Sequence, residues 1–215
     1  MMEHPTHSAR LRAHNLAHWD AMQAHRFVAD IQADALPDAV FANYLRYEHR
    51  FVETAVTIFG HALVKAPDFA SKRWLAGVLH ALATEQIPYF EAMFARLGIT
   101  ALPPEAVLPE PVRAFDRGML EMAANGSYHD AIVAMMCAEW MYSEWCGAAA
   151  RKTISHPGIR AWVDLHADEA FTRQALWLRE QIDSIPDEHF DFAGANAVFA
   201  KALALEIDFH SAAYQ

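Results

Sequence analysis

The segment from Ile132 to Cys146 places one acid within an otherwise apolar helical face, and this arrangement limits what the chain can fold into. Its apolar residues recur at the spacing of one side of an α-helix, so Glu139 is expected to point inward with them. A buried carboxylate without a partner costs on the order of several kcal/mol or becomes protonated. Glu139 is therefore either neutralised by a buried partner, such as a Tyr or Arg, or used for chemistry.

Helical periodicity continues along the whole chain, and no run alternates with period two over more than a few residues. Proline is suited to a first helical turn, Ser to an N-cap and Gly to a helix stop. The sequence therefore predicts an all-α bundle of about seven helices. They are expected from Arg10 to about Ala33, from Pro37 to about Val64, from Ser71 to Leu97 before Gly98, from Val112 to Ala124 after a Pro-rich loop, and then from starts near Ser127, Pro157 and Phe192.

Size and composition favour a single domain over residues 1–215. With 215 residues, 54% of them hydrophobic, the chain can bury a sizeable core, and no Gly/Ser/Pro-rich linker divides it. A net charge of −10, without a Lys/Arg cluster interleaved with aromatics, argues against nucleic acid as a partner.

Three further features predict a cytoplasmic location. No apolar run reaches the roughly 18 residues of a membrane span, so no membrane partner is expected. The N-terminus lacks the basic stretch and apolar segment of a secretory signal. Cys137 and Cys146 lie nine positions apart on one expected helix and cannot bridge each other, which fits a reducing compartment.

Glu48, Glu139 and Glu206 all lie within apolar helical surroundings, on three different expected helices. One such acid is usually a surface residue, but three with aromatics one turn away indicate a carboxylate-lined pocket in the bundle core. Neighbouring carboxylates raise one another's pKa, which can supply a protonated acid and an ionised base near neutral pH.

An ordered set of short motifs covers nearly the whole chain. Each is degenerate, but their combination and order resemble the TenA/thiaminase II family. The motifs are Phe41-(x)2-Tyr44-Leu45-(x)2-Glu48-(x)2-Phe51, then Ala138-Glu139-Trp140-Met141-Tyr142-(x)-Glu144, then Trp162-(x)3-His166-(x)4-Phe171, and finally Leu205-Glu206-(x)2-Phe209.

This resemblance implies a heme-oxygenase-like helical fold with a deep pocket for a thiamin-related aminopyrimidine, commonly in a homo-oligomer such as a tetramer. Glu48 stands where the family usually has the Asp that grips the pyrimidine ring. Glu206 matches the family's C-terminal catalytic glutamate. Tyr142 matches the tyrosine that flanks the ring, and Phe209 matches the C-terminal aromatic residue.

Departures from the resemblance concern the nucleophile and several tyrosines. Ala138 occupies the position of the family's nucleophilic cysteine, and the adjacent Cys137 is turned from it by about 100° on a helix. The arrangement is similar to the branch called TenA_E, which lacks the cysteine and has a glutamate that Glu139 matches. Phe51, Phe115 and His166 fall where the cysteine-bearing branch has Tyr. The two phenylalanines can also be plain core residues, and the histidine a structural one.

Without the thiol, thiamin cleavage through a sulfur adduct loses its nucleophile. Hydrolysis remains open, with Glu139 or Glu206 taking a proton from water while the other protonates the departing nitrogen. Glu48 would orient the ring. The sequence thus predicts an aminopyrimidine aminohydrolase or a formylaminopyrimidine amidohydrolase of thiamin salvage. It needs no cofactor or metal, and its ligand is a small-molecule pyrimidine.

The sequence leaves two other classes of function open. A di-iron oxidase of the same fold would need a Glu-x-x-His pair, but Glu85 is followed three residues later by Pro88, and His80 has Thr84 one turn on. His14 and His18 have helical spacing, but their helix offers no third ligand in sequence. A non-catalytic pyrimidine-binding protein also fits the sequence, and turnover assays would distinguish it.

Overall fold

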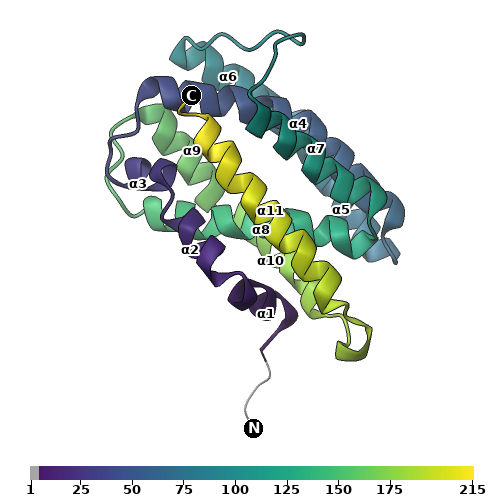
Figure 1. Ribbon diagram of the computed structural model, residues 1–215. Helices are drawn as coiled ribbons and strands as arrows, with labels where there is room; N and C mark the ends of the chain where they lie inside the picture. Colours follow the sequence, from purple (N-terminus) through teal and green to yellow (C-terminus); the bar gives the residue numbers. More distant parts are fainter. Residues whose placement is uncertain (1–4) are drawn as a thin grey trace.

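The computed structural model describes residues 5–215, and within this range the chain is helical with no β-strand (Figure 1). A π-helical turn, Leu82–Gln86, joins α5 and α6 into one continuous helix, and a short 3₁₀ turn, Asp187–His189, precedes the last helix. The α-helices are α1 (His7–His14), α2 (Leu16–Gln23), α3 (Arg26–Gln32), α4 (Asp38–Lys65), α5 (Phe69–Ala81), α6 (Ile87–Leu97), α7 (Glu110–Asn125), α8 (Tyr128–Ala149), α9 (Pro157–Ala167), α10 (Glu169–Asp183) and α11 (Phe192–Ala212).

The all-helical prediction is confirmed, but the number of about seven helices is wrong. With α5 and α6 taken as one, the described residues form ten helices. The expected helix from Arg10 to Ala33 is divided into α1, α2 and α3, because short polar side chains bond locally and compete with the helical ladder. Asn15 donates to the carbonyl of Leu11 at 2.9 Å, and His25 caps α3. Asp168 likewise ends α9 and caps α10, where one helix was expected.

Other predicted boundaries are close to the observed ones. Gly98 ends α6 in a left-handed conformation, φ 66°, and Ser127 caps α8 in a reciprocal capping box with Asp130. The cap expected from Ser71 is instead provided by Asp68, whose carboxylate accepts from the Ser71 backbone N–H at 2.8 Å.

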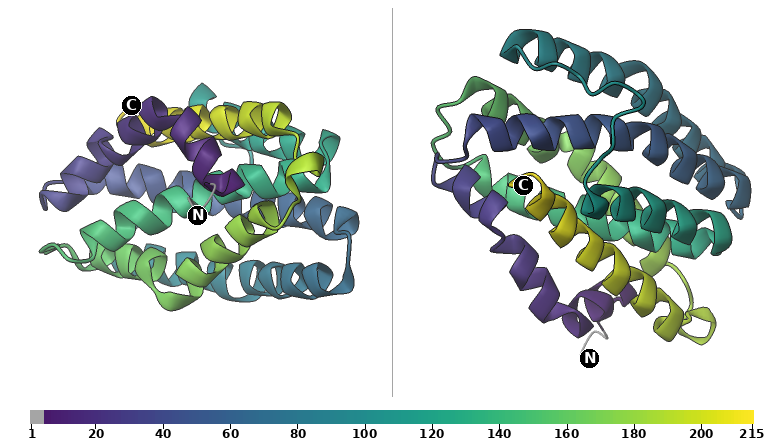
Figure 2. Two further views of the ribbon diagram at one scale, coloured as in Figure 1. Left: turned by 90° about the horizontal axis from the view of Figure 1, so that it is seen from below. Right: turned by 45° about the horizontal axis from the view of Figure 1, so that its top comes forward.

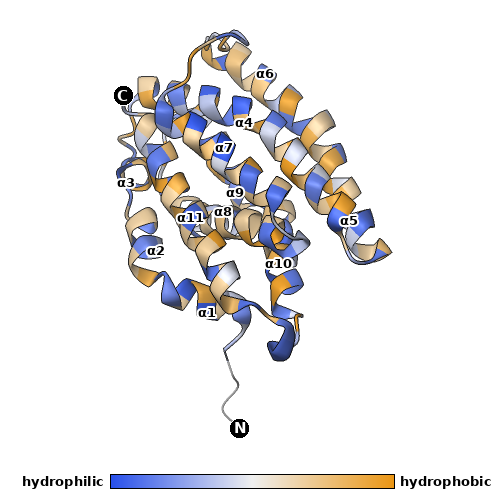
Figure 3. Cartoon of the chain, turned by 45° about the vertical axis from the view of Figure 1, so that its right-hand side comes forward, coloured by the Kyte–Doolittle hydropathy of each residue, from blue (hydrophilic) through white to orange (hydrophobic). Residues whose placement is uncertain are grey.

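Helix α8 runs through the middle of the bundle and packs against α4, α7, α9, α10 and α11 (Figures 1 and 2). Most of its residues are buried, on every side of the helix, as expected for a central core helix. The helices around it are two-sided, with hydrophilic residues on the outer faces of α5, α7 and α10 (Figure 3). Within residues 5–215 no helix combines the length and apolar character needed to cross a membrane.

Lys65, at the end of α4, joins this helix to the end of α7. Its ammonium donates to the carbonyls of Ala123, Ala124 and Gly126 at 2.6, 2.9 and 2.6 Å. These carbonyls lie at the helix end and lack helical partners, and the helix dipole favours a cation there.

We expect Lys65→Met to lower the free energy of unfolding by about 1–3 kcal/mol, because three charge-assisted hydrogen bonds are lost. Urea denaturation would measure it. Lys72→Met, at an exposed position on α5, is the matched control and should stay within about 0.5 kcal/mol of the wild type. Equal stabilities for the two variants would contradict the prediction.

Candidate active site

A cavity of about 100 Å³ lies inside the bundle, between α4, the π-helical turn, α7, α8, α9, α10 and α11. A larger groove of about 620 Å³ lies between α5, α8 and α10, and none of the predicted site residues lines it. The inner cavity is lined by all eight of them. They are Glu48 and Phe51 from α4, Phe115 from α7, Glu139 and Tyr142 from α8, His166 from α9, and Glu206 and Phe209 from α11.

Further lining residues were not predicted. Val52, Ala55 and Phe59 follow Phe51 along α4, and Met135 and Ala138 share the inner face of α8 with Glu139, so helical spacing could have found these five. Helical spacing could not have found the other three, which are Leu82, Gln86 and Phe171.

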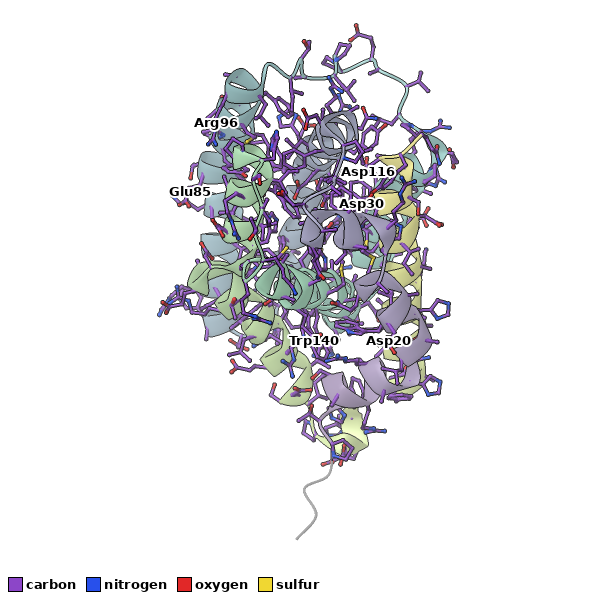
Figure 4. The ribbon with its side chains drawn as sticks, turned by 90° about the vertical axis from the view of Figure 1, so that its left-hand side faces the viewer. Asp20, Asp30, Glu85, Arg96, Asp116 and Trp140 are labelled. Atoms are coloured by element: carbon purple, nitrogen blue, oxygen red, sulfur yellow. The ribbon has the colours of Figure 1, made fainter. Side chains whose placement is uncertain are left out.

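Leu82 and Gln86 reach the cavity from the two ends of the π-helical turn. A π turn widens the helix and shifts its register, and such turns are frequent at functional sites. Glu85, inside the same turn, is exposed and points away from the bundle (Figure 4).

Glu48 is contacted by two side chains from α9, of which Trp162 is a hydrogen-bond donor. Trp162 donates its indole N–H to Oε2 at 2.7 Å, and Nε2 of His166 lies 3.4 Å from Oε1. Nδ1 of His166 donates to the Trp162 carbonyl at 2.8 Å, which fixes the ring with Nε2 toward the acid. The Trp162 hydrogen bond and the His166 ring together orient the Glu48 carboxylate at the wall of the cavity.

Glu206 is the most deeply buried of the three acids, with 1% of its surface exposed. Burial and then the charge of Glu48 raise its pKa to about 8, and a hydrogen bond from Tyr142 acts in the opposite direction. Tyr142 donates toward Oε2 at 3.5 Å, and its hydroxyl lies 2.6 Å from that of Tyr44. A carboxyl of this kind can exchange a proton near neutral pH.

Glu139 points into the cavity, as its place on α8 predicted. Burial raises its pKa to about 8, and a hydrogen bond with Gln174 offsets a part of this effect. Its Oε2 is buried and has no hydrogen-bond partner among the described residues. Glu139 was expected to be either neutralised by a buried partner or used for chemistry. Its neutralisation is incomplete, because one carboxyl oxygen remains available to a ligand or water.

Three phenylalanines form an apolar wall of the cavity. Phe115 packs against Phe51 with ring centroids 4.6 Å apart and against Phe209 at 4.7 Å. Rings in this arrangement present flat apolar surface, which suits a planar ligand ring. The cavity thus combines aromatic surface with carboxylates, and no Lys or Arg is among its lining residues.

The thiol is directed away from the cavity, as the helical rotation predicted. Ala138 lines the cavity, whereas Cys137 is fully buried and its Sγ contacts the carbonyl of Phe199 at 3.6 Å. Burial raises the pKa of Cys137 well above its ordinary value, so its reactive thiolate form is disfavoured. Sulfur chemistry therefore has no nucleophile at this site.

The residues considered for a di-iron centre are not brought together. In the described part of the chain, no group of three or more His, Cys, Asp and Glu side chains is placed to hold a metal ion. The oxidase alternative therefore finds no ligand set in residues 5–215.

Fold and cavity together define a class, that of helical-bundle proteins with an acid-lined pocket between their helices. The family model described as TENA/THI-4/PQQC family matches residues 12–215. The chain therefore belongs to this family.

Known relatives agree with this assignment. The aminopyrimidine aminohydrolase of Halalkalibacterium halodurans is 26% identical over 202 residues, covering 91% of this chain and 90% of that protein. The TenA homologue of P. horikoshii OT3 has a similar structure, with a TM-score of 0.89 at 19% identity over 98% of this chain and 99% of that one. A TenA homologue of Pyrococcus furiosus has a TM-score of 0.88 at 19% sequence identity, over 97% of this chain and 100% of that one.

Proposed function

We propose that this protein hydrolyses a thiamin-derived aminopyrimidine, replacing an amine on the ring's methylene carbon with a hydroxyl group. The observation that carries the proposal is the convergence of Glu48, Glu139 and Glu206 in one cavity that no thiol lines. The name of the relative from Halalkalibacterium halodurans supports the same reaction. Hydrolysis of the N-formyl derivative is the alternative within this reaction class.

Glu206 is the general base in this scheme. Tyr142 directs a hydrogen bond at it, which favours its ionised form, and its raised pKa matches proton transfer near neutral pH. It takes a proton from water as the water oxygen attacks the methylene carbon and the carbon–nitrogen bond breaks.

Glu139 is the general acid. Its unpaired Oε2 and its raised pKa favour the protonated form before the substrate binds. It gives its proton to the departing nitrogen, so ammonia leaves and the ring carries a hydroxymethyl group. The two glutamates then return to their starting forms when the proton passes back through water.

The remaining residues bind the ring in this proposal. Glu48, oriented by Trp162 and His166, accepts hydrogen bonds from the ring amino group. Tyr142, Phe51, Phe115 and Phe209 contact the ring faces, and no cofactor takes part. The proposal also includes a homo-oligomer in the cytoplasm. Exposed large apolar side chains such as Val64 and Phe69 support the homo-oligomer. The two free cysteines support the cytoplasmic location.

The test is incubation of metal-free protein with three substrates, namely thiamin, the aminomethylpyrimidine and its N-formyl derivative. We expect ammonia release from the aminomethylpyrimidine and little or no cleavage of thiamin. Formate release from the N-formyl derivative alone would select the amidohydrolase alternative. Binding without turnover would replace catalysis with a pyrimidine-binding role, and activity only after iron loading would support an oxidase.

A further inference from the structure

Tyr44 on α4 lies behind the cavity wall and does not line the cavity. Its side chain is fully buried, and its hydroxyl forms a 2.6 Å hydrogen bond with the hydroxyl of Tyr142. Tyr142 in turn donates toward Oε2 of Glu206. Two tyrosines from different helices are thus connected in series to the acid.

The surroundings of Tyr44 give this series a direction. Aromatic rings enclose it, including those of Phe27 at 4.5 Å and Trp162 at 5.3 Å, and in the described residues its hydroxyl has only Tyr142 as a partner. Because the Tyr44 hydrogen has no other acceptor, it must point to the Tyr142 oxygen, and the Tyr142 hydrogen is then free to point at Glu206. The reverse order would leave a buried donor unpaired.

We propose that Tyr44 is a positioning residue, which acts through Tyr142 to direct a hydroxyl hydrogen at Glu206 and to hold this carboxyl ready to accept a proton from water. This role rests on the proposed function, in which Glu206 is the base. Tyr44 itself touches neither the substrate nor the reacting atoms.

The other titratable groups around Glu206 do not replace this donor. Glu48 opposes ionisation by its charge. His210, one turn further along α11, donates Nδ1 to the backbone carbonyl of Glu206 at 2.8 Å, and burial lowers its pKa to about 3, so the ring is neutral. The groups that face Glu206 or its immediate neighbours are Tyr44 and Glu48 from α4, Cys137, Glu139 and Tyr142 from α8, His166 from α9, the N-cap of α3, His25, and His210 from α11 itself.

The test is the pH profile of kcat/KM for Tyr44→Phe. Loss of the directed hydrogen bond should move the acidic limb, where the base ionises, to a pH higher by about one unit. The rate at pH 7 should therefore fall by about 3- to 10-fold and recover to within about twofold of the wild type above the limb. Tyr142→Phe should move the limb in the same direction, and adding Tyr44→Phe to it should cause no further movement.

Tyr47→Phe removes a hydroxyl from the same helix outside the series and should leave the profile unchanged. A fall in rate by the same factor at every pH would show a merely structural role and overturn the proposal, as would an unmoved limb. Infrared titration of the protonated carboxyl band, assigned with Glu206→Gln, follows the same ionisation without turnover. If the wild type hydrolyses no pyrimidine, the proposed function fails, while an upward shift of this titration in Tyr44→Phe still supports the hydrogen-bond series.

Discussion

Glu206→Gln should lower kcat for aminopyrimidine hydrolysis by about 10²–10⁴-fold, the range expected when a general base is lost. The amide keeps the size of the side chain but cannot take a proton from water. Because Glu206 is buried with a raised pKa, the substitution also removes an unfavourable ionisation, and the fold should be retained. Steady-state ammonia release and circular dichroism would measure the two effects.

Asp208→Asn offers a matched control, because Asp208 lies two residues away on α11 and is exposed to solvent. This variant should hydrolyse the substrate at the wild-type rate. Glu139→Gln, which removes the acid, should also be slow, and its loss should be smaller for substrates whose leaving nitrogen needs less protonation. If Glu206→Gln and Glu139→Gln both match the wild type, the carboxylate scheme is wrong.

The sequence could place Glu48, Glu139 and Glu206 in one site because each acid breaks a regular apolar face, and such faces meet at the bundle core. Helical rotation also separated Cys137 from Ala138 correctly. Gln86 could not be placed in this way, since the π-helical turn that brings it to the cavity departs from the 3.6-residue repeat of an α-helix.

The predicted number of about seven helices was wrong for a different reason. Asn15, His25 and Asp168 interrupt helices through side-chain hydrogen bonds to nearby backbone groups. Asn, His and Asp also occur within continuous helices, so the residue type alone does not mark a break. Apolar spacing continues across such breaks because the successive short helices pack on the same core. Sequence periodicity thus reports which face is buried more reliably than where the backbone turns.

Glu139→Gln should make the protein more stable than the wild type at pH 8, by about 4 kcal/mol. Burial raises the pKa of Glu139 from the ordinary value of 4.5 to about 8. Below pH 4.5 the carboxyl is protonated in both the folded and the unfolded chain, so it carries no penalty. Between pH 4.5 and 8 the unfolded chain releases this proton while the folded chain retains it, and stability is lost as the pH rises.

A glutamine carries no proton to release, so the advantage of the variant should appear only across this pH range. Urea denaturation at pH 4.5, 6 and 8 would measure it, with a difference near zero at the lowest pH. Glu121→Gln, at a position on α7 with a side chain 52% exposed, should show no such dependence. A difference for Glu139→Gln that is the same at all three pH values would instead reflect packing, because only an ionisation shifted by the fold can tie the gain in stability to pH.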